Sequence, residues 1–181
     1  ENKRINPMKI GLFYGSTTCY TEIAAEKIQA HFQPGVVELF NLKETSLTEC
    51  EAFELLIFGI STWDYGELQE DWESLWPQIS ELDLSGKVVA LYGMGDQIGY
   101  TEWFQDALGM LHEQVVAQGA YVIGYWPNQG YEFGASKALT QDQTQFVGLA
   151  LDEDNQYNLS DQRIATWCEQ LEHEINELLN Q

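Results

Sequence analysis

Residues 10–22, with the sequence IGLFYGSTTCYTE, join an apolar run to a loop that is rich in hydroxyl groups. The run at 9–14 predicts a buried strand, and the apolar residues from 24 to 32 recur at helical spacing. The unpaired N–H groups and the dipole at the N-terminus of such a helix favour an anion. Because the loop contains no lysine or arginine, we expect neutral donors alone to hold a phosphate monoester there.

Two other interpretations of this loop use the same residues. The loop could be a helix cap rich in Ser and Thr that binds no ligand. Cys19 could instead be the nucleophile of a phosphatase. That chemistry needs an arginine a few residues later, yet residues 20–25 read YTEIAA. The loop also matches neither a Walker A sequence nor a GxGxxG motif, so we favour the anion site over these alternatives.

Further apolar runs alternate with helical patterns along the chain. Strands are predicted at 36–40, 55–60, 87–93 and 121–124, with helices between them that contain Leu68 to Ile79 and Phe104 to Val115. The run at 55–60 shows no polar alternation, which is typical of a parallel strand covered on both faces. The order predicts an α/β fold, a doubly wound parallel sheet with right-handed crossovers. Ligands of such sheets bind beyond the carboxyl ends of the strands.

The regular pattern lapses between residues 125 and 144, where Gly, Pro, Asn, Gln and aromatic residues dominate. A segment of this length without a clear pattern predicts an insertion with some structure of its own. We expect the strand pattern to resume at 145–149. Ser160 is the expected N-cap of a last helix, whose apolar stripe runs from Ile164 to Leu178.

Composition limits the function further. The 181 residues suffice for one domain, and 29 acidic against 8 basic residues give a net charge of −21, which argues against nucleic acid as a partner. No apolar stretch approaches the about 18 residues that cross a membrane. Three unpaired cysteines without a signal peptide indicate the cytoplasm. We expect residues 1–7 to be a flexible extension or a remnant of an expression vector, and 8–181 to be one domain.

Two aromatic residues follow two other predicted strands. Trp63 lies in the loop 61–67, STWDYGE, and Tyr100 ends the glycine-rich loop 93–100, GMGDQIGY. Both loops are expected at the same edge of the sheet as the phosphate loop. Two aromatic rings above a phosphate pocket describe a clamp for a planar phosphorylated ligand, because stacking supplies binding and glycines let the backbone approach the ring.

These motifs together resemble those of long-chain flavodoxins, over essentially residues 8–181. The phosphate loop is similar to the family's T/S-x-T-G-x-T pattern, and it is followed by Thr62-Trp63, by GDQIGY at 95–100 and by FVGLALDEDNQ at 146–156. The segment 125–144 resembles the insertion in the last strand of long-chain members. The resemblance implies a five-stranded parallel sheet of order 2-1-3-4-5, the order for which flavodoxins themselves are the known example, and it implies FMN as the cofactor.

By this resemblance the FMN phosphate would lie on the first loop and the flavin ring between Trp63 and Tyr100. Asp96 would bond the pyrimidine edge with help from the Gly95 backbone, and Asp154 would lie near the ribityl chain. The residues that would bind FMN are Ser16, Thr17, Thr18, Cys19, Tyr20, Thr21, Ser61, Thr62, Trp63, Asp64, Tyr65, Gly66, Met94, Gly95, Asp96, Tyr100, Trp103, Phe104 and Asp154.

The sequence departs from the family pattern at two of these positions. Cys19 replaces the usual glycine, as in the flavodoxin 2 subgroup, which costs free energy if this residue needs φ > 0. Met94 lies where many relatives have threonine. In the family, a peptide that corresponds to Asp64-Tyr65 turns its carbonyl toward the flavin. If Asp64 and Tyr65 are the two central residues of that turn, the flip requires φ > 0 at Tyr65, which tyrosine resists.

The function implied is one-electron transfer with non-covalent FMN, between the semiquinone and the hydroquinone. Acidic residues are frequent in the sequence after Trp63. A negative charge about 8 Å from the flavin, at an effective dielectric near 20, raises the free energy of the anionic hydroquinone by roughly 2 kcal/mol. A low potential is therefore expected. We expect a monomer, not an enzyme, that meets basic redox partners such as a flavodoxin reductase and acceptor enzymes. The alternative is an FMN reductase that acts directly on quinone or NAD(P)H.

Overall fold

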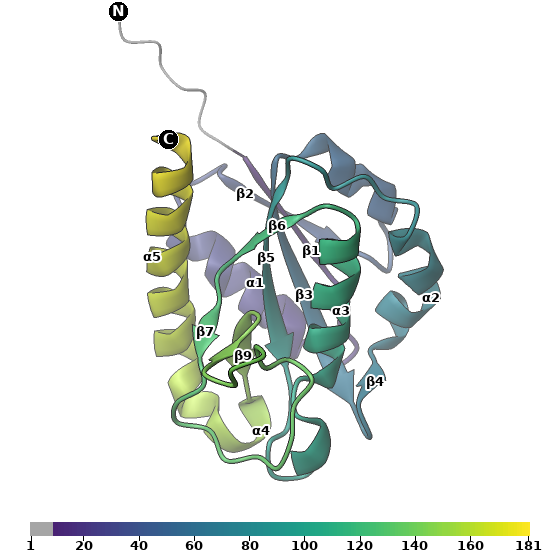
Figure 1. Cartoon of the computed structure of the whole chain (residues 1–181), viewed down its shortest axis with the longest axis vertical. Coiled ribbons are helices and arrows are strands. Elements are labelled where there is room, and N and C mark those ends of the chain that lie inside the picture. The colour runs from purple at the N-terminus through teal and green to yellow at the C-terminus, as the bar shows by residue number, and fades with distance from the viewer. Residues whose placement is uncertain (1–8) are drawn as a thin grey trace, which may run out of the picture.

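A seven-stranded, mostly parallel sheet forms the centre of the structure, a computed structural model that describes residues 9–181 (Figure 1). Its main strands run in the order β2-β1-β3-β5-β6, with β4 beside β3 and β9 beside β5. The strands span Ile10–Tyr14 (β1), Val37–Asn41 (β2), Leu55–Trp63 (β3), Glu67–Leu68 (β4), Val88–Met94 (β5), Tyr121–Ile123 (β6) and Leu149–Leu151 (β9). The predicted order 2-1-3-4-5 is confirmed when β5 is counted as the fourth strand and β6 with β9 as the fifth.

The last strand of the sheet is split in two. β6 pairs with residues 88–90 of β5, and β9 pairs with residues 92–94 of the same strand. The chain leaves the sheet between them, which confirms an insertion at this place. The predicted strand at 145–149 is wrong in its extent, because Gln145–Phe146 (β8) pairs with Trp126–Pro127 (β7) in a separate antiparallel sheet. The insertion is thus closed by its own hairpin, and the main sheet resumes only at Leu149.

Helices cover both faces of the sheet, as the apolar runs predict. Helices α1 (Tyr20–His31) and α5 (Ser160–Leu179) lie on one face, where Ile28, Trp167 and Leu171 are buried against the strands. Helices α2 (Glu70–Ile79) and α3 (Asp106–Ala117) lie on the other face, together with the short 3₁₀ helix η1 (Leu47–Ala52). The central strands β1, β3 and β5 therefore contribute to two separate cores, which explains why they lack polar alternation.

Three helix boundaries differ from the prediction. Leu68 belongs to β4 and not to α2, and Phe104 precedes α3 at the end of the 3₁₀ helix η2 (Thr101–Trp103). Ser160 is the first residue of α5 and not its N-cap, and its Oγ has no hydrogen-bond partner. The chain reaches α5 already in helical form through α4 (Glu153–Gln156) and η3 (Tyr157–Leu159), so the capping oxygen is needed earlier, where Asp152 provides it for α4.

The carboxyl ends of β1, β3 and β5 meet at one edge of the sheet, because these strands are parallel neighbours. Three loops leave this edge, at residues 15–19, 64–66 and 95–100. The predicted N-terminal extension at 1–7 lies outside the described residues. Within residues 9–181, no helix combines the length and the apolarity that crossing a membrane requires.

Candidate functional site

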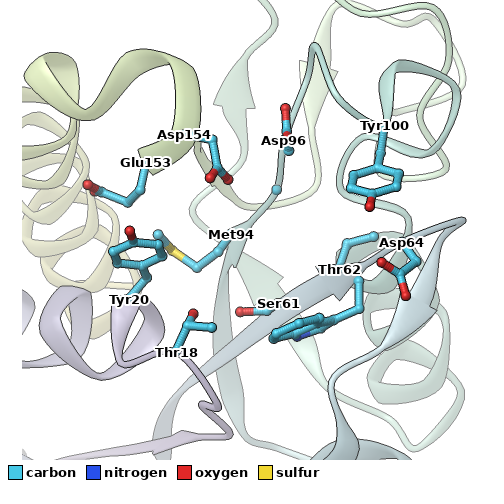
Figure 2. A pocket seen from close by; sticks show the side chains of 12 residues that line it. Thr18, Tyr20, Ser61, Thr62, Asp64, Met94, Asp96, Tyr100, Glu153 and Asp154 are labelled. Carbon is cyan, nitrogen blue, oxygen red and sulfur yellow. The ribbon is translucent and has the colours of Figure 1, made fainter.

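A cavity of about 240 Å³ opens at this edge of the sheet (Figure 2). All three loops contribute to its wall, and so does the start of α4. The lining residues are Thr18, Tyr20, Ser61, Thr62, Trp63, Asp64, Met94, Gly95, Asp96, Tyr100, Glu153 and Asp154. Eleven of these twelve belong to the predicted site, and Glu153 is the addition.

Trp63 and Tyr100 supply the aromatic part of this wall. Trp63 is the last residue of β3 and pairs with Glu67 of β4, so a β-hairpin holds its backbone. Its indole Nε1 is buried and has no partner among the described residues. The neighbouring Asp64 carboxylate raises the pKa of the Tyr100 hydroxyl, and Figure 2 shows this hydroxyl pointing toward Asp64. The hairpin and the Asp64 contact together orient both rings before any ligand binds.

The turn between β3 and β4 has three central residues, because Trp63 pairs with Glu67. Asp64 and Gly66 have left-handed backbones, with φ of 44° and 86°, whereas Tyr65 does not. Gly66 is thus a third residue of the loop, and the premise that Asp64 and Tyr65 are the two central residues of a four-residue turn stays a prediction. The Tyr65 ring does not line the cavity and lies edge-on to two neighbouring rings, 6.0 Å from that of Tyr100 and 5.0 Å from that of Trp103.

The hydroxyl-rich loop presents unused donors at the start of α1. Within residues 9–181, no protein acceptor is found for the backbone N–H groups of residues 16–22, and the buried Ser16 Oγ also lacks a partner. Thr21 is held from beneath, since its hydroxyl lies 2.6 Å from Ser61 Oγ and its carbonyl accepts from the Tyr92 hydroxyl at 2.8 Å. Unpaired donors at a helix N-terminus are what an anion requires, so this loop stays the predicted anion site.

Cys19 has a left-handed backbone at the N-cap of α1, with φ of 69°. A left-handed conformation costs a residue with a Cβ about 1–2 kcal/mol, and glycine avoids this cost. Glycine also makes the unfolded chain more flexible, which offsets part of the gain in stability. We expect Cys19→Gly to raise the free energy of unfolding by about 0.5–1 kcal/mol, and the Tm by about 2 °C. Thermal and urea unfolding of the apoprotein measure both.

Cys19→Ala is the matched control for this prediction. It removes the thiol but keeps the Cβ, so the backbone strain remains and stability should not increase. A glycine variant that is no more stable than the alanine variant would contradict the prediction.

The loop at 95–100 is held by a network that reaches into the last part of the chain. Asp96 Oδ1 accepts from the N–H groups of Ile98 and Gly99 at 3.1 and 2.7 Å, and from Asn155 Nδ2 at 2.8 Å. The buried Asp152 accepts from the backbone and side chain of Gln97 at 3.1 and 2.7 Å. This side of the cavity therefore depends on the turn between β9 and α4.

Acidic side chains dominate the wall opposite the aromatic rings. Figure 2 shows Asp154 and Glu153 at the start of α4, on the side of Tyr20 and Met94. Partial burial of Asp154, together with the charges of Asp96, Asp152 and Glu153, raises the pKa of its carboxyl. A ligand that reaches this wall should present hydroxyl groups to it rather than its phosphate, because the phosphate would be repelled.

The remaining predicted residues lie at different distances from the cavity. Ser16, Thr17, Cys19 and Thr21 belong to the anion loop beside it, although they do not line it. Tyr65, Gly66 and Trp103 lie behind the aromatic wall, where a Cβ on Gly66 would be 3.1 Å from the Trp103 ring. Phe104 is buried in the core against Tyr131 and Phe133 of the insertion, so the structure does not bring it to the site.

Several residues that support the site are not marked by any local sequence pattern. Gln69 contacts the anion loop, and Asp152 and Asn155 hold the loop at 95–100. Their partners lie about fifty positions away in the chain, beyond the reach of any local pattern. The described residues contain no group of three or more side chains that could hold a metal ion.

The arrangement can bind a flat ring and an anionic group at the same time. The unpaired Ser16 Oγ and N–H groups fit a phosphate, and the cavity beside Trp63 and Tyr100 fits an aromatic ring. Flavin mononucleotide combines these two groups, so the residues present fit this cofactor.

Comparison with known proteins agrees with this geometry. The family model described as flavodoxin matches residues 12–167. The chain is 58% identical to flavodoxin 2 of Escherichia coli over 170 residues, which is 94% of this chain and 98% of the relative. It is 48% identical to a flavodoxin of Nostoc over 92% of this chain and 97% of that one. The crystal structure of Fusobacterium nucleatum flavodoxin bound to flavin mononucleotide superposes with a TM-score of 0.86 at 33% identity, over 92% of this chain and 98% of that one.

Proposed function

The chain belongs to the flavodoxin family, and we propose that it carries single electrons on an FMN bound at the cavity beside β1, β3 and β5. It is accordingly an electron-transfer flavoprotein and not an enzyme. The observation that carries the proposal is the loop at residues 16–22, whose backbone N–H groups have no protein acceptor and which lies beside an aromatic cavity.

We assign the phosphate to the N–H groups and hydroxyls of residues 16–21 and the ring to the space between Trp63 and Tyr100. Ser61 and Thr62 lie beneath the ring, where the Thr62 hydroxyl also accepts from the Ala107 N–H at 3.0 Å and so caps α3. Asp96 and the Gly95 backbone would meet the pyrimidine edge, and Asp154 the ribityl hydroxyls. When bound, FMN supplies the redox chemistry, whereas the protein supplies binding and orientation and excludes water.

Acidic residues surround the aromatic wall and support a low potential. Asp64, Glu67, Glu70 and Glu73 are exposed around β4 and the start of α2, and the whole chain carries a net charge of −21. Negative charge raises the free energy of a reduced flavin that is itself an anion. The same surface would attract basic redox partners, such as a reductase that donates electrons and enzymes that accept them. We further propose a monomer in the cytoplasm, which the three free thiols support.

Titration of the apoprotein with FMN, followed by stepwise anaerobic reduction of the complex, tests this function. We expect tight binding in a 1:1 ratio, which quenching of flavin fluorescence measures, and a long-wavelength absorption band that rises and then falls. This band reports reduction in two separate one-electron steps. Absence of FMN binding would overturn the proposal. Rapid turnover of NAD(P)H with quinone by the protein alone would favour the reductase alternative.

A further inference from the structure

The side chain of Gln69 connects the start of α2 with the anion loop. Gln69 is 1% exposed, and its Oε1 accepts from the backbone N–H groups of Asp71 and Trp72 at 3.1 and 3.4 Å. Its Nε2 donates to Thr17 Oγ1 at 3.0 Å and to Asp71 Oδ2 at 2.9 Å. One buried amide thus caps a helix with its oxygen and contacts the phosphate loop with its nitrogen.

The direction of this amide follows from its surroundings. Two backbone N–H groups face one end of the side chain, and only an oxygen can accept from them. A carboxylate oxygen of Asp71 faces the other end, and only the NH₂ group can donate to it. The group next to Thr17 is therefore a hydrogen-bond donor.

The Thr17 hydroxyl has one proton, and it accepts a hydrogen bond from Gln69 through a lone pair. Among residues 9–181 no acceptor for the Thr17 proton is found, and Thr17 is exposed beside the free N–H groups of its loop. We propose that Gln69 is a positioning residue, which orients the Thr17 hydroxyl so that its proton points to the phosphate of FMN. This inference rests on the proposed function and names the residue that prepares its phosphate site.

The orientation of a hydroxyl matters more here than in a phosphate site that contains a cation. Residues 15–21 include no lysine or arginine, so a lone pair turned toward the phosphate would repel it without compensation. The loop also lies close against Gln69, since a Cβ on Gly15 would be 2.2 Å from Gln69 Oε1 and 2.9 Å from Trp72 Cδ1. The amide and the loop therefore lie in close contact at Gly15, where no side chain fits between them.

The test compares FMN with riboflavin, which has the same ring but no phosphate. For Gln69→Met we expect the Kd for FMN to rise about tenfold, while the Kd for riboflavin stays within about twofold. Flavin fluorescence quenching measures both constants on the apoprotein. Gln69→Glu is the second variant, because its carboxylate can still accept from the N–H groups of Asp71 and Trp72 and so keep α2 capped while it removes the donor.

A double-mutant cycle with Thr17→Val separates orientation from a structural effect. In the Thr17→Val background, Gln69→Met should change FMN binding by less than about twofold, because the hydroxyl is gone. An equal loss for FMN and riboflavin, or a full effect of Gln69→Met without the hydroxyl, would overturn the inference and leave the proposed function intact. Failure of the unaltered protein to bind FMN would instead overturn the proposed function itself.

Discussion

Trp63→Ala should weaken FMN binding by about 30-fold, which corresponds to about 2 kcal/mol of lost stacking. The indole and the Tyr100 ring are the aromatic groups beside β3 and β5 in the cavity wall, whereas the start of α4 contributes carboxylates. Trp63 is the last residue of its strand and lies outside both hydrophobic cores, so its removal should cost little folding stability. Fluorescence titration of the apoprotein with FMN gives the Kd.

Trp63→Phe provides the matched control, because it keeps a flat ring in the same place. Its Kd for FMN should remain within about fivefold of the unaltered protein, since stacking is reduced but not lost. Riboflavin should lose as much affinity as FMN in Trp63→Ala, in contrast to the Gln69 variants. If the alanine and phenylalanine variants bind FMN equally well, the indole is not a stacking partner of the ring.

The parts of the fold that could be predicted from the sequence are those with local causes. The strand at Leu55 and its neighbours are apolar on both faces because helices cover both, and this leaves a direct trace in composition. The anion loop, Trp63 and Tyr100 directly follow such strands. Parallel strands bring their carboxyl ends to one edge, so the approximate place of the site follows from the order of the elements.

The predictions from the sequence failed where contacts between distant residues override a local pattern. Phe146 continues an apolar run, but it pairs with Trp126 across the insertion and not with β5. Ser160 has the side chain of an N-cap, but the preceding segment enters α5 in helical form. Gln69 meets Thr17 across 52 positions, and no periodicity in the sequence indicates that pair.

The left-handed residues of the β3–β4 turn illustrate the same limit at short range. Asp64 and Gly66 acquire positive φ because Trp63 pairs with Glu67 and leaves three residues to close the hairpin. The number of residues between paired positions decides which residue is left-handed, and a glycine at position 66 fits either a three-residue or a longer turn. The pairing register of β3 and β4, and not the composition of the loop, therefore determines which turn residues are left-handed.

Asp152→Ala should lower the free energy of unfolding by about 4 kcal/mol, because it removes the acceptor for several buried donors at once. Asp152 is fully buried and accepts from Gln97 N and Nε2, and its Oδ1 accepts from the Asn155 N–H at 3.0 Å. Alanine cannot accept any of these bonds, and water does not reach the site freely. Urea unfolding of the apoprotein measures the change, which should appear as a lower midpoint with an unchanged slope.

Asp161→Ala is the control, because Asp161 is also an aspartate near the start of α5 but lies on the surface. Among residues 9–181 its carboxylate pairs only with Lys27, and both side chains are exposed, so its loss should change stability by less than about 0.5 kcal/mol. A loss below about 1 kcal/mol for Asp152→Ala would mean that the network contributes little.

The affinity for FMN provides a second measurement of what the Asp152 network contributes. Gln97 also accepts from the Glu132 N–H at 2.6 Å, and Asn155 bonds Asp96, so the loop at 95–100 is tied to the insertion and to α4 through groups around Asp152. Without this carboxylate, the loop should sample more conformations and close on the ring less often. We therefore expect Asp152→Ala to weaken FMN and riboflavin alike, because the loop meets the ring and not the phosphate. A variant that is destabilised but binds both flavins normally would show that the network supports the fold without preparing the site.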